Sequence, residues 1–310
     1  MITTVTLNAS IDKAYVLDGI LNPGIVMRVK EVRNTAGGKG LNVTKIVNLC
    51  GQPVLATGFL GGFNGKYLEF LLEQDQIASQ FTWVQGETRS CINILEDKFS
   101  STEFLEPGFT VSAEEELAFL DNFRQLLDQT NIVTISGSLP KGVSPSIYGT
   151  LIAETKAAGK RVILDSSGAS FKEGLLAKPT MVKPNQEELE ALFDVTISST
   201  ENVITYGQKL VDQGIEYVLI SLGGEGAVLL HAGKVYQGRP PKIDPVNTVG
   251  CGDSMVGAFA VALERNYSPV DCLKFAIAVG TANALSPFTG NFDPEILDNI
   301  HAQVTVEEVK

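Results

Sequence analysis

Short runs of apolar, mostly β-branched residues alternate with helical patterns along much of this chain. The runs are continuous, which is typical of parallel strands that are buried on both faces. Because each run is followed by a helical pattern, the order predicts an α/β fold with a mostly parallel sheet between two layers of helices. The predicted strands are "ITTVTL" (2–7), "VLATGFL" (54–60), "IVTISG" (132–137), "RVILDSS" (161–167), "TMVKP" (180–184) and "YVLISLG" (217–223).

Capping signals mark where the predicted helices begin. A serine followed three residues later by glutamate predicts a capping box, in which each side chain bonds the other residue's backbone N–H. Such pairs are Ser112 with Glu115, opening a helix over 113–129, and Ser198 with Glu201, opening one over 199–213. After a strand and hairpin at 217–237, two apolar helices are predicted over 253–266 and 269–286, covering one face of the sheet.

Two segments break this rhythm. Residues 11–34 and 88–106 contain short, partly alternating strands around turns, without helices. This pattern predicts a small antiparallel layer outside the main sheet, formed by two segments far apart in sequence. We expect it to act as a β lid over the carboxyl ends of the parallel strands, where such sheets bind ligands. One domain over 1–310 with a discontinuous lid is therefore predicted.

The charge balance limits the partners. The 310 residues include 36 acidic and 24 basic residues, a formal net charge of −12. This argues against nucleic acid, which needs a basic footprint, and requires any anionic ligand to be held by a local positive site. No apolar run approaches the length of about 18 residues that a membrane span needs, so no membrane partner is expected. Four scattered cysteines indicate free thiols in a reducing compartment, and a cytoplasmic protein is expected.

The scarcity of histidine excludes two kinds of site. The chain has only His231 and His301, and neither lies in a recognisable motif. A Ser-His-Asp hydrolase and a histidine-rich metal centre are therefore not expected.

Two glycine loops carry the candidate chemistry. "AGGKGLNV" (36–43) precedes a predicted helix over 41–50, and "TVGCGDSM" (248–255) precedes the helix over 253–266. A glycine turn at a helix start directs free backbone N–H groups and the positive end of the helix dipole at an anion. Neither loop fits a Walker motif, because no Gly-Lys pair is followed by Ser or Thr. The first loop also fails as a dinucleotide fingerprint, since its third glycine position falls on Val43.

An acid in the second loop suggests phosphoryl transfer. Such an enzyme needs backbone amides for the transferring phosphate and a carboxylate that accepts the proton of the attacking hydroxyl. Asp253 stands directly after the two glycines of this loop. It also has a purely structural interpretation, as an acid favourably placed in the first turn of a helix. Taken alone, the residues leave both interpretations open.

The two loops resemble the two signatures of the phosphofructokinase-B (PfkB)/ribokinase family of carbohydrate kinases. Their order and separation match that family, and further segments resemble it along nearly the whole chain. These are "TLNASID", "ISGSLPKG", "VILDSSG", "VKPNQEE" and "SLGGEGA". The resemblance implies a ribokinase-like three-layer α/β/α sandwich with a small β lid.

The resemblance also implies roles for individual residues. Asp253 matches the catalytic carboxylate, and the amides of Gly250, Cys251, Gly252 and Asp253 match the anion hole. Matches to sugar-phosphate contacts are Asp12, Gly38, Lys39, Asn42 and Arg89, with Arg28 sharing phosphate binding. Matches to nucleotide contacts are Lys183, Asn185, Ser221, Gly223, Gly224, Gly226, Thr248 and Asn283, and Glu188 matches a magnesium ligand that acts through water. Asp165 fits either a functional strand end or a helix cap.

Within the family, "GQPVLATGFLGG" (51–62) and "GETRSCINIL" (86–95) look most like tagatose-6-phosphate kinases, with 1-phosphofructokinases next. The implied cofactors are ATP and Mg²⁺, with a monovalent cation left open, and the implied small-molecule partner is a ketohexose monophosphate. Exposed lid strands predict a homodimer formed through the lid. Ile25 and Leu105 depart from related sugar-phosphate kinases, which often carry Lys and Asn there. The alternatives from other classes are a nucleotide- or sugar-binding regulator without catalysis and a Rossmann dehydrogenase.

Overall fold

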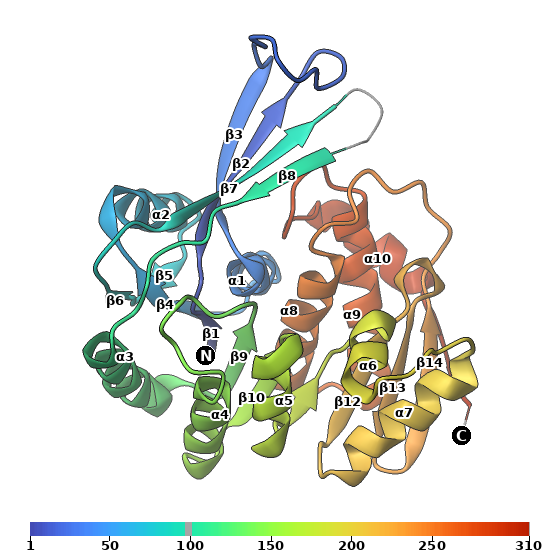
Figure 1. The fold of residues 1–310 in the computed structure, drawn as a ribbon. Coiled ribbons are helices and arrows are strands. Elements are labelled where there is room, and N and C mark those ends of the chain that lie inside the picture. The colour runs from blue at the N-terminus through green and yellow to red at the C-terminus, as the bar shows by residue number, and fades with distance from the viewer. Residues whose placement is uncertain (97–100, 310) are drawn as a thin grey trace.

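The computed structural model describes residues 1–96 and 101–309. Its main sheet is flanked by helices on both faces, and a second, smaller sheet projects from one end (Figure 1). Residues 97–100, which belong to the predicted lid segment 88–106, lie outside the described residues. No helix within the described ranges is long and apolar enough to cross a bilayer. The four cysteines are free thiols.

The main sheet is parallel in its centre and antiparallel at one edge. Its strands follow the spatial order β15 (Thr305–Glu308), β14 (Lys234–Arg239), β13 (Ala227–His231), β12 (Tyr217–Ser221), β11 (Met181–Val182), β10 (Arg161–Asp165), β9 (Ile132–Ser136), β1 (Ile2–Thr6), β4 (Val54–Leu60) and β5 (Ala78–Ser79), with β6 (Thr82–Trp83) also beside β4. The pairs from β4 to β12 are parallel, and β12 to β15 pair antiparallel. All six strands predicted from apolar runs are present.

Two hydrophobic cores lie on the two faces of this sheet. One packs α1 (Lys39–Leu49), α2 (Gly62–Gln74), α8 (Cys251–Glu264), α9 (Pro269–Ala284) and α10 (Pro294–Gln303). The other packs α3 (Ala113–Leu126), α4 (Ile147–Ala157), α5 (Gly168–Leu176), α6 (Gln186–Phe193) and α7 (Thr200–Asp212). Consecutive strand residues enter opposite cores, as Ile132 and Val133 do, so the sheet is buried on both faces. This explains why the strand sequences are continuously apolar.

The smaller sheet confirms that the two distant segments pair. Its order is β3 (Glu31–Gly37), β2 (Ser10–Val16), β7 (Arg89–Leu95) and β8 (Ser101–Leu105), and we call these four strands the lid sheet. One detail differs from the prediction of an antiparallel layer. Each segment forms an antiparallel pair, but the joint between them, β2 with β7, is parallel. Both strands leave the main domain at the same end, and this shared direction makes their pairing parallel.

The helix caps agree with one predicted capping box and correct the other. Ser112 and Glu115 form the predicted reciprocal box at the start of α3. At α7 the cap is Ser199, whose hydroxyl accepts a hydrogen bond from the Asn202 N–H, so the prediction of Ser198 with Glu201 was wrong by one residue. Two serines stand side by side there, and local sequence does not decide which one becomes the cap.

Candidate active site

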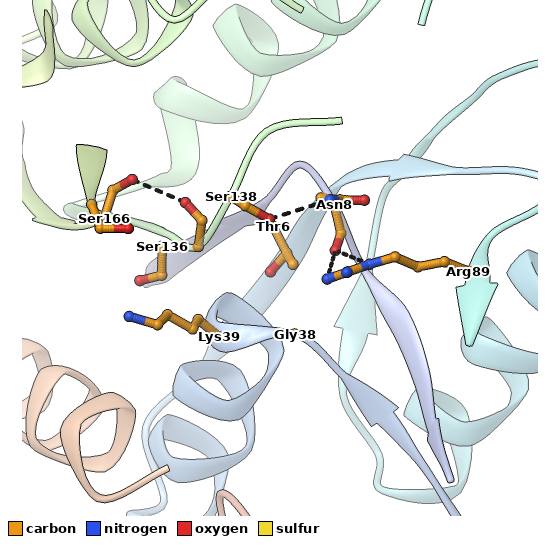
Figure 2. A pocket seen from close by; sticks show the side chains of 10 residues that line it. Thr6, Asn8, Gly38, Lys39, Arg89, Ser136, Ser138 and Ser166 are labelled. Atoms are coloured by element: carbon orange, nitrogen blue, oxygen red, sulfur yellow. Dashed lines mark hydrogen bonds between the residues drawn. The ribbon is translucent and has the colours of Figure 1, made fainter. Parts of the chain in front are cut away.

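A cavity of about 180 Å³ opens at the carboxyl ends of β1, β9 and β10, beside the base of the lid sheet. This is the edge at which open parallel sheets bind ligands. Figure 2 shows Arg89 on one side of the cavity and Lys39 on the other. The lining residues are Thr6, Asn8, Gly38, Lys39, Arg89, Ser136, Gly137, Ser138, Ser166 and Ser167.

Arg89 is held in place by backbone carbonyls. It is the first residue of β7, and its Nε and Nη2 donate to the Asn8 carbonyl oxygen at 3.3 and 3.0 Å. Its Nη1 reaches the Glu106 carbonyl oxygen at 3.5 Å. Within the described ranges no carboxylate forms an ion pair with Arg89. A fixed guanidinium whose charge is not neutralised suits an incoming phosphate.

Asp12 lies on β2 near the base of the lid sheet. Its carboxylate accepts a hydrogen bond from the Ser10 hydroxyl at 2.6 Å. A side chain at Gly37 would overlap the Asp12 carboxylate, since a Cβ there would stand 2.0 Å from it. Burial raises the pKa of Asp12, while the Ser10 hydroxyl and the cations of Lys45 and Arg89 oppose this rise. The side chain is thus fixed as a hydrogen-bonding group.

The second glycine loop forms an uncapped helix start. Gly250 precedes α8 with a φ of +80°, and no side chain of the described residues caps the helix there. A Cβ at Gly250 would stand 2.6 Å from the Thr289 methyl group, and one at Gly252 would stand 3.2 Å from Lys183 Nζ. Glycine is therefore required at Gly250 by both conformation and space. The Cys251 N–H donates to the Thr248 carbonyl oxygen at 3.4 Å, whereas the N–H groups of Gly252 and Asp253 have no acceptor among the described residues. These two amides are available to an anion, and Lys183 adds positive charge beside them.

Asp253 is a buried carboxylate in the first turn of α8. Its side chain accepts a hydrogen bond from Asn42 Nδ2 at 2.8 Å, and only 6% of the residue is exposed. Burial, with the neighbouring charge of Asp165, raises the pKa of Asp253 to about 6, although Asn42, Lys39 and Lys183 favour the charged form. The predicted roles place Asn42 on the sugar phosphate. In the structure it donates a hydrogen bond to the Asp253 carboxylate.

The Lys39 ammonium lies near three acidic side chains. The negative charges of Asp165, Asp253 and Glu188 raise its pKa, with Asp165 contributing most and burial opposing. Its Nζ lies 3.9 Å from Glu188 Oε1. Lys39 also lines the cavity shared with Arg89. It therefore connects the predicted sugar-phosphate side of the site with the carboxylate side.

Asp165 and Lys183 form a buried ion pair at the ends of β10 and β11. Lys183 Nζ lies 3.3 Å from Asp165 Oδ1, and both side chains are almost fully buried. Neither Asp165 oxygen accepts a hydrogen bond from the described residues. The Lys183 ammonium balances the charge of Asp165, but the hydrogen-bonding capacity of these buried oxygens is unused, which suits a further ligand. Asp165 is thus a functional candidate that the sequence left undecided.

Most of the predicted nucleotide residues lie at the carboxyl ends of β11 and β12, but some of them also form a helix cap. Asn185 and Ser221 form an isolated parallel bridge, and the Ser221 N–H donates to the Pro184 carbonyl oxygen at 3.2 Å. Beyond Ser221, the exposed turn of Gly223 and Gly224 runs to Gly226, whose φ is +93°. These residues lie together at one sheet edge. Asn185 and Glu188, however, form a capping box at the start of α6, so one oxygen of each is already used in the helix cap.

Asn283, which is predicted to contact the nucleotide, is engaged in hydrogen bonds within the chain. It is fully buried, and its Nδ2 donates to the Val249 carbonyl oxygen at 3.0 Å. Its Oδ1 accepts from the N–H groups of Gly290 and Asn291 at 2.9 and 3.2 Å. All its polar capacity holds two loops together, so Asn283 positions the glycine loop from behind. Thr248 is exposed, as the nucleotide interpretation requires.

Arg28 is exposed in the connection between β2 and β3 and does not line the cavity. Conversely, the cavity contains polar residues that sequence reasoning did not single out. Thr6, Asn8 and Ser136 each have a buried oxygen without a hydrogen-bond partner among the described residues. The available signal was their position, because Thr6 and Ser136 end parallel strands at the functional edge.

The raised pKa of Asp253 predicts a pH-dependent cost to stability. Its pKa of about 6 in the folded chain exceeds the ordinary 3.8, so the folded state binds this proton more tightly. The stabilising protonated form is fully present below about pH 4 and lost as pH rises through 6. Relative to Asp253→Asn, the wild-type free energy of unfolding should fall by about 2 kcal/mol between pH 4 and pH 7. Denaturant titrations at several pH values measure this; a pH-independent difference would contradict it.

Comparisons with known proteins place the chain in a family. The chain matches the model of the pfkB family of carbohydrate kinases over residues 5–296. It is 41% identical over 313 residues to the tagatose-6-phosphate kinase of Staphylococcus epidermidis, covering 100% of both chains. The chain therefore belongs to the pfkB family of carbohydrate kinases.

Solved structures agree in fold. The structure of phosphofructokinase-2 from Escherichia coli in complex with potassium matches with a TM-score of 0.90 and 29% identity, covering 97% of this chain and 98% of that one. A protein of Thermotoga maritima described as a possible 1-phosphofructokinase matches with a TM-score of 0.90 and 25% identity, over 100% and 99% of the two chains. The ribokinase-like α/β fold with a small lid sheet is thereby confirmed.

Proposed function

We propose that this chain is an ATP-dependent kinase that converts a ketohexose monophosphate to a bisphosphate. One observation carries the proposal. Asp253, buried and fixed by Asn42, stands in the same helical turn as free amides that can hold a phosphoryl group. A hydroxyl acceptor and a phosphoryl donor would therefore meet at adjacent backbone positions.

The chemistry follows from this arrangement. Arg89 would hold the phosphate already present on the sugar, and Asp12 would orient a sugar hydroxyl. Asp253 would accept the proton of the attacking hydroxyl as the new P–O bond forms, a role worth about 10² to 10⁴ in rate. The amides at the start of α8 and the Lys183 ammonium would hold the negative charge of the transferring phosphoryl group.

The donor set fits ATP with a divalent cation. Asn185, Ser221 and the glycine turn at 223–226 would hold the nucleotide at the sheet edge. Asp165, with two buried carboxylate oxygens that accept no hydrogen bond from the described residues, and Glu188 would face the metal. The described residues contain no cluster of three or more acidic, histidine or cysteine ligands. Two carboxylates suit Mg²⁺, which keeps several waters and takes further oxygens from phosphates. When bound, the ion would neutralise charge on the phosphates.

We propose tagatose 6-phosphate as the substrate, with fructose 1-phosphate as the alternative. The identity to the S. epidermidis tagatose-6-phosphate kinase supports the first, and the Thermotoga maritima structure supports the second. Steady-state kinetics with ATP on both sugars should give a higher kcat/KM for tagatose 6-phosphate. An equal or reversed preference would overturn the first choice.

Repeating the assay with and without K⁺ tests whether a monovalent cation is required, because the E. coli structure contains potassium.

We propose that the chain works in the cytoplasm as a homodimer joined through the lid sheet. The lid sheet and its connecting segments expose apolar side chains, including Val26 at 91%, Leu105 at 64% and Ile25 at 62%. A second copy would cover these side chains and pair the exposed strand edges. A tetrameric inhibited form of E. coli phosphofructokinase-2 is among the structural neighbours.

A charge on the lid sheet should disrupt this dimer. We expect Leu105→Glu to shift the chain from dimer to monomer in sedimentation velocity, since a charge buried at an interface is costly. The matched control is Leu176→Glu, which changes an even more exposed leucine, at 76%, at the end of α5. A monomeric wild type, or a Leu105→Glu variant that remains dimeric, would contradict the proposal.

A further inference from the structure

Lys45 is a cation close to the candidate site that the proposed chemistry does not use. It lies on α1, three residues after Asn42, and its Nζ donates to the Thr289 carbonyl oxygen at 3.2 Å. Within the described ranges it forms no ion pair with a carboxylate. Burial lowers the pKa of Lys45, opposed by the charges of Asp12, Asp75 and Asp253. A half-buried ammonium without a direct partner charge is costly. Among the described residues, the Thr289 carbonyl oxygen is the one acceptor of a hydrogen bond from Lys45 Nζ, so this contact needs an explanation.

The bonded residue, Thr289, stands directly behind the glycine loop. A Cβ on Gly250 would stand 2.6 Å from the Thr289 methyl group, so this methyl already fills the space beside Gly250. The Thr289 hydroxyl accepts a hydrogen bond from Asn247 Nδ2 at 3.3 Å, within the segment that leads into the loop. Thr289 therefore contacts the glycine loop with its methyl group and the preceding Asn247 with its hydroxyl group, while its carbonyl oxygen accepts from Lys45 on α1.

Gly290, the next residue, likewise lies between α1 and the residues that hold the glycine loop. The Gly290 N–H donates to Asn283 Oδ1 at 2.9 Å, and a Cβ on Gly290 would stand 3.0 Å from the Asn42 Cα. Helix α1 thus reaches the catalytic region at two points. Asn42 holds the Asp253 carboxylate, and Lys45 holds the segment that supports the amides preceding it.

We propose that Lys45 is a positioning residue for phosphoryl transfer. By fixing the Thr289 carbonyl, it keeps Thr289 packed on Gly250 and thereby keeps the amides at the start of α8 directed at the transferring phosphoryl group. Because these amides act mainly on the transition state, the effect belongs in kcat rather than in the KM of the sugar phosphate. The proposal rests on the proposed kinase function and assigns it a further residue.

The test compares Lys45→Met, which removes the ammonium but keeps the chain length, with Lys45→Arg, which keeps a cation. We expect Lys45→Met to lower kcat about tenfold or more through misplaced groups, with the sugar-phosphate KM changed less than about threefold. Lys45→Arg should recover most of the loss. The matched control is Lys274→Met, another half-buried helical lysine, on α9. A folded Lys45→Met variant with kcat within twofold of wild type would overturn the proposal.

Thr289→Ser provides an independent arm, because it removes only the methyl group that packs on Gly250. If Lys45 acts through Thr289, the two substitutions break the same chain of contacts. The kcat of the Lys45→Met/Thr289→Ser double variant should then lie within about twofold of the kcat of Lys45→Met. Fully additive losses would contradict this route. If Lys45→Met does not fold, Thr289→Ser alone carries the test: a lower kcat at constant KM supports the route, and a wild-type kcat overturns it.

One further control separates this proposal from the proposed function. Wild-type turnover is measured first on a panel of phosphosugars. If none is phosphorylated, the proposed function fails, and the same variants are compared in ATP hydrolysis, where water replaces the sugar hydroxyl as acceptor. A lower hydrolysis rate in Lys45→Met would then support the positioning role, and an unchanged rate would overturn it.

Discussion

Asp253→Asn is expected to lower kcat by about 10² to 10⁴ while leaving ATP binding nearly unchanged. The substitution keeps the size of the side chain and an oxygen that can accept from Asn42. It removes the group that takes up the proton of the attacking hydroxyl. Because the ionised carboxylate is buried, the variant should also be more stable than wild type at pH 7. Turnover and nucleotide titration on the same preparation measure both effects.

A matched control separates catalysis from the first-turn position. Asp271 lies in the first turn of α9 and is exposed, with its carboxylate bonded to the Ser268 hydroxyl. Asp271→Asn should leave kcat unchanged. If Asp253→Asn retained wild-type turnover, Asp253 would be a structural acid in a helical turn, and the catalytic assignment would be wrong.

Arg89→Gln is expected to raise the KM for the sugar phosphate by about 30-fold or more. The guanidinium is held by the Asn8 carbonyl and lacks a carboxylate partner among the described residues, so its charge is available for the substrate phosphate. The effect should disappear when an unphosphorylated ketohexose is the acceptor, because that sugar offers no phosphate. Comparing kcat/KM for the two acceptors measures this selectivity.

Two other arginines serve as controls for this prediction. Arg124 pairs with Asp121 and Glu154 on the surface, so Arg124→Gln should leave KM unchanged. Arg28 is exposed and does not line the cavity, so Arg28→Gln should raise KM less than Arg89→Gln does. If Arg89→Gln impaired phosphorylated and unphosphorylated acceptors equally, Arg89 would not be the phosphate contact.

Most of the fold could be predicted from local patterns. Strands buried on both faces have continuously apolar sequences, and this pattern placed all six predicted strands. The two lid segments were recognisable because they lack helical periodicity. The parallel pairing of β2 with β7 was not predicted, since alternation along a strand does not specify the direction of its partner. The cap of α7 was missed by one residue because two adjacent serines compete for it.

The site was harder to predict, because its contacts join residues far apart in sequence. Asn42 and Asp253 are separated by 211 positions, and no local pattern indicates their hydrogen bond. Burial is equally invisible in a motif. It raises the pKa of Asp253 and encloses the Asn283 side chain. A motif also does not show competing uses of one side chain, and the capping box of Asn185 and Glu188 is such a case.

The central claim is that Asp253 and the amides before it transfer a phosphoryl group to a ketohexose monophosphate. The most direct measurement follows the product by ³¹P NMR after tagatose 6-phosphate and ATP are mixed with wild type and with Asp253→Asn. The account predicts a second phosphate ester on the sugar, with ADP in equal amount, for wild type and almost none for the variant. Bisphosphate formation at the wild-type rate in Asp253→Asn, or no bisphosphate from any ketohexose phosphate with wild type, would contradict it.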